Sequence, residues 1–77
     1  MAESVYVLTL ASPDQVESSV YANAAKCRGD FQNLVNGLLA KQDEVSLDMV
    51  LNDEEDHGDF FDGYGINMRW QQEEIVE

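Results

Sequence analysis

The chain has 77 residues, 44% of them hydrophobic, and a net charge of −12 from 16 acidic and 4 basic side chains. This length fits one small domain over residues 1–77, and the hydrophobic content excludes a fully disordered chain. Four lysines and arginines are too few for direct nucleic-acid binding, which depends on positive charge that neutralises phosphates. A single cysteine excludes an internal disulfide and a cysteine-based zinc site.

The N-terminus has no basic segment followed by a long apolar run, so no signal peptide is visible. The longest apolar run, from Val5 to Leu10, is too short to cross a bilayer. We therefore expect a soluble, cytoplasmic protein with no membrane partner.

Residues 5–11 predict the first element, a strand. This segment, Val-Tyr-Val-Leu-Thr-Leu-Ala, is β-branched, aromatic and aliphatic, with little polar alternation. Such a composition is typical of a strand that is central in its sheet or buried on both faces.

A long helix is predicted over residues 13–40. Ser12 is a capping residue, and Pro13 suits the first helical position. The apolar stripe that follows keeps its phase through Gly29, which favours one helix, with a kink near this glycine as a variant. The alternative is two helices broken at Arg28-Gly29-Asp30. The stripe has spacings of three and four and consists of Val16, Val20, Ala24, Cys27, Phe31, Leu34, Val35 and Leu38.

Two further strands are predicted after the helix, because residues 44–51 and residues 66–72 both alternate between apolar and polar side chains. Residues 52–62 between them form an acidic loop, and residues 73–77 either extend the last strand or fray. The predicted fold class is α+β with the order β-α-β-β. It is a three-stranded, mostly antiparallel sheet with one long helix packed on one face. Placing the first strand beside the last makes every neighbour antiparallel, and a right-handed crossover onto the second strand is the alternative.

The acidic segment from Asn52 to Asp62 is the candidate functional site. It holds six carboxylates and no lysine or arginine. Residues 43–77 hold twelve acidic residues against Arg69 alone, a net charge of −11, whereas residues 1–42 have a net charge of −1. Such a field attracts basic protein surfaces and repels nucleic acids and anionic membranes.

Three aromatic side chains, Phe60, Phe61 and Tyr64, lie within or just after this segment. Apolar anchors inside a charged rim are the usual layout of a binding hot spot, although packing in the core is the alternative for Phe60 and Phe61. The predicted partner interface consists of Asp43, Glu44, Asp48, Asp53, Glu54, Glu55, Asp56, Asp59, Phe60, Phe61, Asp62, Tyr64, Glu73 and Glu74.

Catalytic and metal chemistry find little support in the sequence. His57 is the only histidine, so local spacing supports no serine–histidine or cysteine–histidine pair, and Cys27 on the apolar stripe is expected in the core. A calcium loop that started at Asn52 would need glycine at position six and glutamate at position twelve, where His57 and Gly63 stand. We therefore expect a protein that is not an enzyme and uses no metal or cofactor.

In its size and its block of acids from Asp53 to Asp62, the chain resembles a class of small acidic phage-encoded inhibitors of bacterial defence. This class includes anti-CRISPR and anti-restriction proteins. Further acids outside the block, Asp43, Glu44, Asp48, Glu73 and Glu74, carry the same resemblance.

The resemblance implies an inhibitor that mimics nucleic-acid charge. Its partner would be a basic nucleic-acid-binding protein, such as a nuclease or a defence complex, in the cytoplasm of a phage-infected host. The alternative is an immunity protein, antitoxin or regulatory subunit that docks through the helix or Phe60-Phe61 rather than through charge. A monomer and a dimer both remain open.

Overall fold

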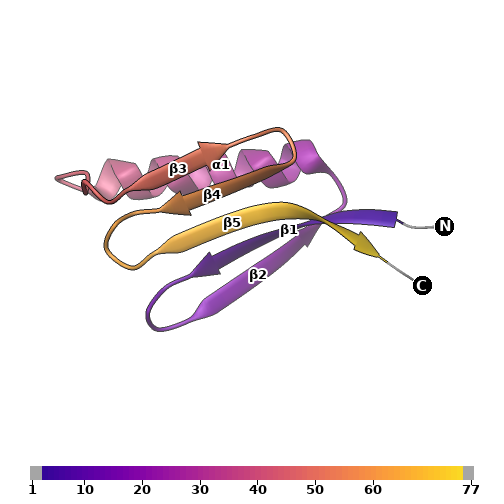
Figure 1. Cartoon of the computed structure of the whole chain (residues 1–77), viewed down its shortest axis with the longest axis horizontal. Coiled ribbons are helices and arrows are strands. Elements are labelled where there is room, and N and C mark those ends of the chain that lie inside the picture. Colours follow the sequence, from indigo (N-terminus) through magenta and orange to yellow (C-terminus); the bar gives the residue numbers. More distant parts are fainter. Residues whose placement is uncertain (1–2, 76–77) are drawn as a thin grey trace.

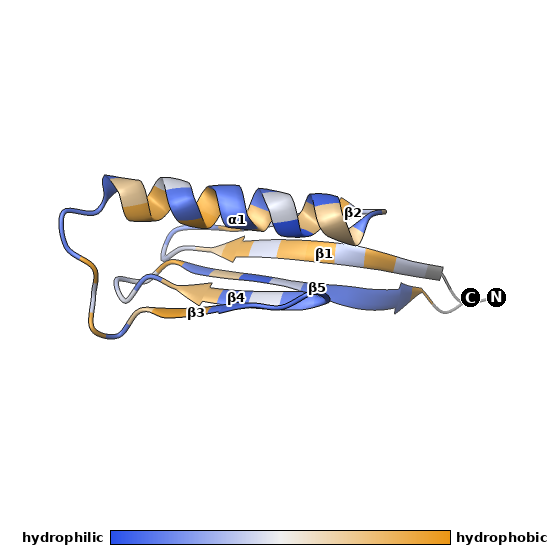
Figure 2. Ribbon diagram, turned by 90° about the horizontal axis from the view of Figure 1, so that it is seen from above, coloured by the Kyte–Doolittle hydropathy of each residue, from blue (hydrophilic) through white to orange (hydrophobic). Residues whose placement is uncertain are grey.

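The computed structural model describes residues 3–75, and in this range the chain forms one helix and five strands. In chain order they are β1 (Glu3–Ala11), β2 (Val16–Tyr21), α1 (Ala24–Lys41), β3 (Val50–Asp53), β4 (His57–Phe61) and β5 (Asn67–Ile75). The strands form one sheet in the order β2-β1-β5-β4-β3, and every neighbouring pair is antiparallel (Figure 1). The helix lies across one face (Figure 2).

The predicted α+β class is confirmed, as is the placement of the first strand beside the last. The prediction of three strands in the order β-α-β-β is wrong, because the described chain has the order β-β-α-β-β-β. Residues 73–75 extend the last strand, whereas residues 76 and 77 lie outside the described residues. No helix in residues 3–75 combines the length and the apolar character that crossing a membrane requires.

The predicted start of the helix at residue 13 is wrong. Ser12 and Gln15 close a turn in which the Ser12 N–H donates to the Gln15 carbonyl at 2.8 Å and the Gln15 N–H donates to Ser12 Oγ at 3.3 Å. Residues 16–21 then pair with β1 along their whole length. Val16 and Val20 misled the prediction because a spacing of four residues fits one face of a helix and one face of a strand.

The helix begins after Asn23, whose side chain accepts a hydrogen bond from the Lys26 N–H at 3.2 Å and so caps the first turn. From Ala24 the helix continues through Gly29 to Lys41, which confirms the prediction of a continuous helix over that glycine. The alternative with a break at Arg28-Gly29-Asp30 is excluded by the same observation.

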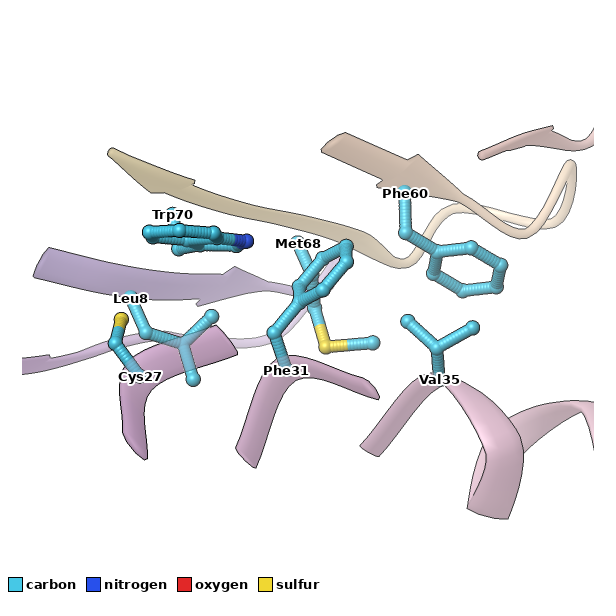
Figure 3. Packing of buried hydrophobic residues seen from close by; sticks show 7 residues of the cluster. All are labelled: Leu8, Cys27, Phe31, Val35, Phe60, Met68 and Trp70. Atoms are coloured by element: carbon cyan, nitrogen blue, oxygen red, sulfur yellow. The ribbon is translucent and has the colours of Figure 1, made fainter. Parts of the chain in front are cut away.

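The core lies between α1 and the middle of the sheet. Cys27, Phe31 and Val35, spaced by four residues, are the buried side chains of the helix. Figure 3 shows Cys27 beside Leu8 of β1, Phe31 directed toward Met68 of β5, and Val35 directed toward Phe60 of β4. The full buried cluster consists of Leu8, Cys27, Phe31, Val35, Phe60, Met68 and Trp70. The expected core position of Cys27 is confirmed.

The predicted strand over residues 44–51 is shorter and later than expected, since β3 begins only at Val50. Its partner β4 ends at Phe61, and the chain turns away over the next five residues. Residues 44–49 therefore have no strand beside them in the sheet, and they form a connection with a turn in which the Met49 N–H donates to the Ser46 carbonyl at 3.2 Å. In this connection Leu47 is fully exposed.

Gly58 permits the close approach of Trp70. The two residues lie opposite each other in the β4–β5 pair, and a Cβ atom at position 58 would stand 2.5 Å from Trp70 Nε1. The indole ring is fully buried and has core neighbours around it, so it has little room to move away. Glycine is thus required at this position by packing.

We expect Gly58→Ala to destabilise the protein by about 1–3 kcal/mol, the usual cost of overpacking a dense core. The matched control is Gly37→Ala, because Gly37 lies in the helix with nothing within 4 Å of an added Cβ. This control should stabilise the protein by about 1 kcal/mol through better helix propensity. Urea unfolding of both variants measures the difference, and equal effects of the two substitutions would contradict this account of Gly58.

Candidate protein-binding surface

The acidic segment over residues 52–62 is a hairpin, whereas the sequence predicted a loop. Asn52 and Asp53 end β3, Glu54 to Asp56 form the turn, and β4 begins at His57. A hydrogen bond from the Glu54 N–H to the His57 carbonyl, 2.9 Å long, closes the turn. The alternation along β4 turns Gly58 and Phe60 to the core and Asp59 away from it, and this pattern gives the strand its buried face.

The exposed carboxylates of residues 43–56 and 73–74 gather at two opposite ends of the sheet. The β3–β4 turn lies toward the end of the molecule where β5 finishes, and the α1–β3 connection lies at the other end (Figure 1). Asp56 and Glu74 line the same shallow polar groove. We call the exposed residues Glu54, Glu55, Asp56, Glu73 and Glu74 the acidic end, and the exposed residues Asp43, Glu44 and Asp48 the loop end.

Asp53 belongs to neither end, because it ties the hairpin to the helix. Its carboxylate accepts a hydrogen bond from Arg28 Nε at 2.9 Å and another from Gln32 Nε2 at 2.6 Å. The Arg28 bond is the main cause that lowers the pKa of Asp53 below its ordinary value, and the Gln32 bond adds to it. Asp53 is therefore occupied by contacts within the fold.

Asp59 is also paired inside the chain. It lies directly opposite Arg69 on the face of the sheet that the helix leaves open, and Arg69 Nε donates to its carboxylate at 2.7 Å. This bond raises the pKa of Arg69 above its ordinary value. Arg69, the only lysine or arginine in residues 43–77, is thus paired with an acid on the neighbouring strand.

Asp62 is 3% exposed and holds the β4–β5 turn together. Its Oδ1 accepts hydrogen bonds from the Tyr64 N–H at 2.8 Å and from the Ile66 N–H at 3.0 Å. Gly63 and Gly65 in this turn have φ values of 85° and 119°, which glycine adopts without strain. A carboxylate that accepts backbone donors inside a turn has a local structural role.

The three aromatic residues do not form one anchor cluster inside an acidic rim. Phe60 is 1% exposed and belongs to the core, which decides between the two alternatives left open for it. Phe61 is half-buried on the open face of the sheet, opposite Asn67. Tyr64 is 62% exposed at the other end of the strand, where its hydroxyl lies 3.4 Å from the Glu44 carbonyl.

Sequence reasoning missed the contribution of His57 to the acidic end. Its Nδ1 lies 2.7 Å from a carboxylate oxygen of Asp56. That bond is the main cause that raises the pKa of His57 above its ordinary value, and the negative charges of Glu54 and Asp59 act in the same direction. Mildly acidic solution therefore adds a positive charge beside the carboxylates, and the signal for it in the sequence is the adjacent Asp56-His57 pair.

No group of three or more histidine, cysteine, aspartate or glutamate side chains within residues 3–75 is placed to hold a metal ion. No protein-family model, curated protein or solved structure matches this chain.

Replacement of Asp62 separates a structural role from a role of its charge. We expect Asp62→Ala to destabilise the protein by about 1–3 kcal/mol, because two N–H groups in the turn lose their acceptor. Asp62→Asn keeps an oxygen at the accepting position and should fold with nearly unchanged stability. Thermal unfolding compares the two variants, and an equally large loss in Asp62→Asn would show that the negative charge itself is required.

The pair between Asp53 and Arg28 predicts a dependence of stability on pH. Because the pKa of Asp53 is lowered by folding, the folded state binds this proton less readily than the unfolded state. The stabilisation is present above the ordinary carboxyl pKa of 3.8 and is lost as pH falls through the lower, folded-state value. We expect Asp53→Asn to be less stable than the wild type at neutral pH and to approach it in strong acid.

The control for this experiment is Asp48→Asn, which removes the same charge from an exposed position in the α1–β3 connection. Removal of one negative charge from a chain with a net charge of −12 should by itself be neutral or slightly stabilising. Urea unfolding from neutral to strongly acidic pH follows all three proteins. If Asp48→Asn and Asp53→Asn show the same change of stability with pH, the pair between Asp53 and Arg28 contributes nothing to the stability of the fold.

Proposed function

We propose that this chain is an acidic inhibitor that binds the basic nucleic-acid-binding surface of a partner protein and competes there with DNA or RNA. A nuclease or a bacterial defence complex such as a CRISPR or restriction system is the kind of partner that fits. The observation that carries the proposal is the acidic end, where five exposed carboxylates come from two separate segments of the chain. Within residues 3–75 none of these five is paired with lysine or arginine.

The geometry of the acidic end supports a surface that resembles nucleic acid in charge. Double-stranded DNA carries one negative charge per about 1.7 Å of its axis. The turn residues Glu54, Glu55 and Asp56 and the β5 residues Glu73 and Glu74 give this end of the sheet a dense negative charge as well, from two short segments of the chain. Carboxylates also accept paired hydrogen bonds from arginine, as phosphates do.

The pairing of the other acids narrows the proposal to part of the predicted interface. Asp53 and Asp59 are paired with arginines, Asp62 is buried in a turn, and Phe60 is in the core. These four residues are therefore left out of the proposed contact surface. The acidic end supplies the main contact, and the loop end, with Tyr64 beside it, lies too far along the sheet to belong to the same compact patch (Figure 1).

Docking through apolar surface has less support. Phe60 is buried, and the outward positions of α1 are mostly polar, among them the exposed Gln32, Asn33 and Asn36. Leu34 is a large apolar side chain exposed on the helix, at 41%. An immunity protein or an antitoxin that acts through its carboxylates would use the same acidic end and differ only in the partner.

Neutralisation of the acidic end tests the proposal. We expect the triple variant Glu54→Gln, Glu55→Gln, Asp56→Asn to associate with the partner at least about tenfold more slowly at low salt, because electrostatic steering is lost. The matched control is Asp43→Asn, Glu44→Gln, Asp48→Asn at the loop end, which removes the same charge and should retain most of the association rate.

The partner is first captured from bacterial lysate at low salt, eluted at high salt and identified by mass spectrometry. Surface plasmon resonance with the captured protein then compares the wild type and the two triple variants, and double-stranded DNA is added as a competitor. An equal loss of association rate in both triple variants would show that only the net charge of the chain matters. No loss of association rate in either variant would refute the role of the acidic end. Binding that DNA does not displace would refute competition for a nucleic-acid site.

A further inference from the structure

The edge strand β2 offers a free hydrogen-bonding edge. It is the outermost strand of the sheet, paired with β1 on one side and with no strand of the described chain on the other. Its six residues, Val-Glu-Ser-Ser-Val-Tyr, are regularly paired from Val16 to Tyr21 with no bulge. The backbone groups along such an edge are a ready template for another strand.

This edge has little of the protection that natural edge strands usually carry. β2 contains no lysine and no proline, and Glu17 is its only charged residue. The opposite edge strand, β3, has only four residues and leads directly into the acidic turn. Of the two edges, β2 is therefore the one that is open to a further strand.

We propose that two copies of this chain pair through β2, antiparallel about a two-fold axis, and join their sheets into one continuous sheet. In such a pair, residues directly opposite each other have side chains on the same face of the sheet. The register in which Ser18 stands opposite Ser18 of the second copy also sets Val16 opposite Val20 of the second copy. The strand is thus complementary to itself.

This arrangement covers two exposed valines of β2. Val16 and Val20 are 67% and 68% exposed on the open face of the sheet, on which Val7 of β1 lies beside Val20. In the paired sheet, each Val16 packs against a Val20 across the two-fold axis, and two such pairs flank the central serines. Cross-strand pairs of β-branched side chains are a stabilising unit of antiparallel sheets.

The distribution of charge allows two strongly acidic copies to meet at this edge. Residues 1–42, which include β2, have a net charge of −1, whereas residues 43–77 have a net charge of −11. β2 and β3 are the opposite edges of the sheet, so pairing through β2 leaves the two acidic turns outermost and far apart. The interface thus uses the edge where repulsion between copies is weakest.

A strand-to-strand contact of this length is smaller than a standard protein interface, so we expect a monomer–dimer equilibrium that depends on concentration. Salt screens the repulsion between the acidic copies and should therefore strengthen the dimer. Binding of a basic partner to the acidic end has the opposite dependence on salt. The two interactions can be told apart on this basis.

Sedimentation equilibrium of the full chain tests the proposal at protein concentrations up to about 1 mM, where even a millimolar dissociation constant gives a large fraction of dimer. We expect the wild type to dimerise and the variant Val16→Lys, Val20→Lys to remain a monomer. The matched control Val50→Lys, Asn52→Lys adds the same charge to the open face of β3 and should dimerise at least as well as the wild type. A wild type that stays monomeric, or a dimer that survives the β2 variant, would overturn the proposal.

Disulfide trapping tests the register. Ser18→Cys should form a covalent dimer on mild oxidation, because opposed residues of antiparallel strands have Cα atoms about 4.5–5.5 Å apart, within reach of a disulfide. In the control Val20→Cys, the two new cysteines stand four residues out of register and should not crosslink. The native Cys27 is fully buried and does not compete. Equal crosslinking of both variants, or none in Ser18→Cys, would overturn the proposed pairing.

Discussion

The packing of α1 against a single face of the sheet is the constraint on which the rest of the structure depends. The helix supplies three buried side chains, Cys27, Phe31 and Val35, and these cover the middle of a five-stranded sheet. The second face of the sheet and both edge strands therefore remain in contact with solvent. The acidic end and the β2 edge both belong to this uncovered surface. Both are available for binding because one helix covers only the middle of one face of the sheet.

The acidic residues of the second half of the chain have two roles. Asp53 and Asp59 are paired with the two arginines, and Asp62 accepts two backbone N–H groups in a turn. These contacts offset part of the repulsion among the charges of this small acidic domain. The carboxylates of the hairpin turn and of β5 are exposed, and none of them is paired with lysine or arginine within residues 3–75.

The proposed dimer and the proposed inhibitor surface are compatible in space. β2 is at one edge of the sheet, and the turn that carries Glu54 to Asp56 is attached to the opposite edge. Two copies joined through β2 would keep both acidic ends uncovered, and each could meet a basic surface. Since salt acts on the two contacts in opposite directions, ionic strength would shift the balance between self-association and partner binding.

The sequence by itself determined the α+β class, the part of the predicted helix 13–40 that begins at residue 24, the apolar–polar alternation in the last strand, and the concentration of acid in residues 43–77. These features depend on periodicity and composition within short segments. Tertiary structure decided that residues 16–21 are a strand, because the spacing of Val16 and Val20 fits both a helix and a strand and only the pairing with β1 selects one. It also decided which carboxylates are free, because Arg28, the partner of Asp53, lies 25 residues away in the chain and no local pattern connects the two.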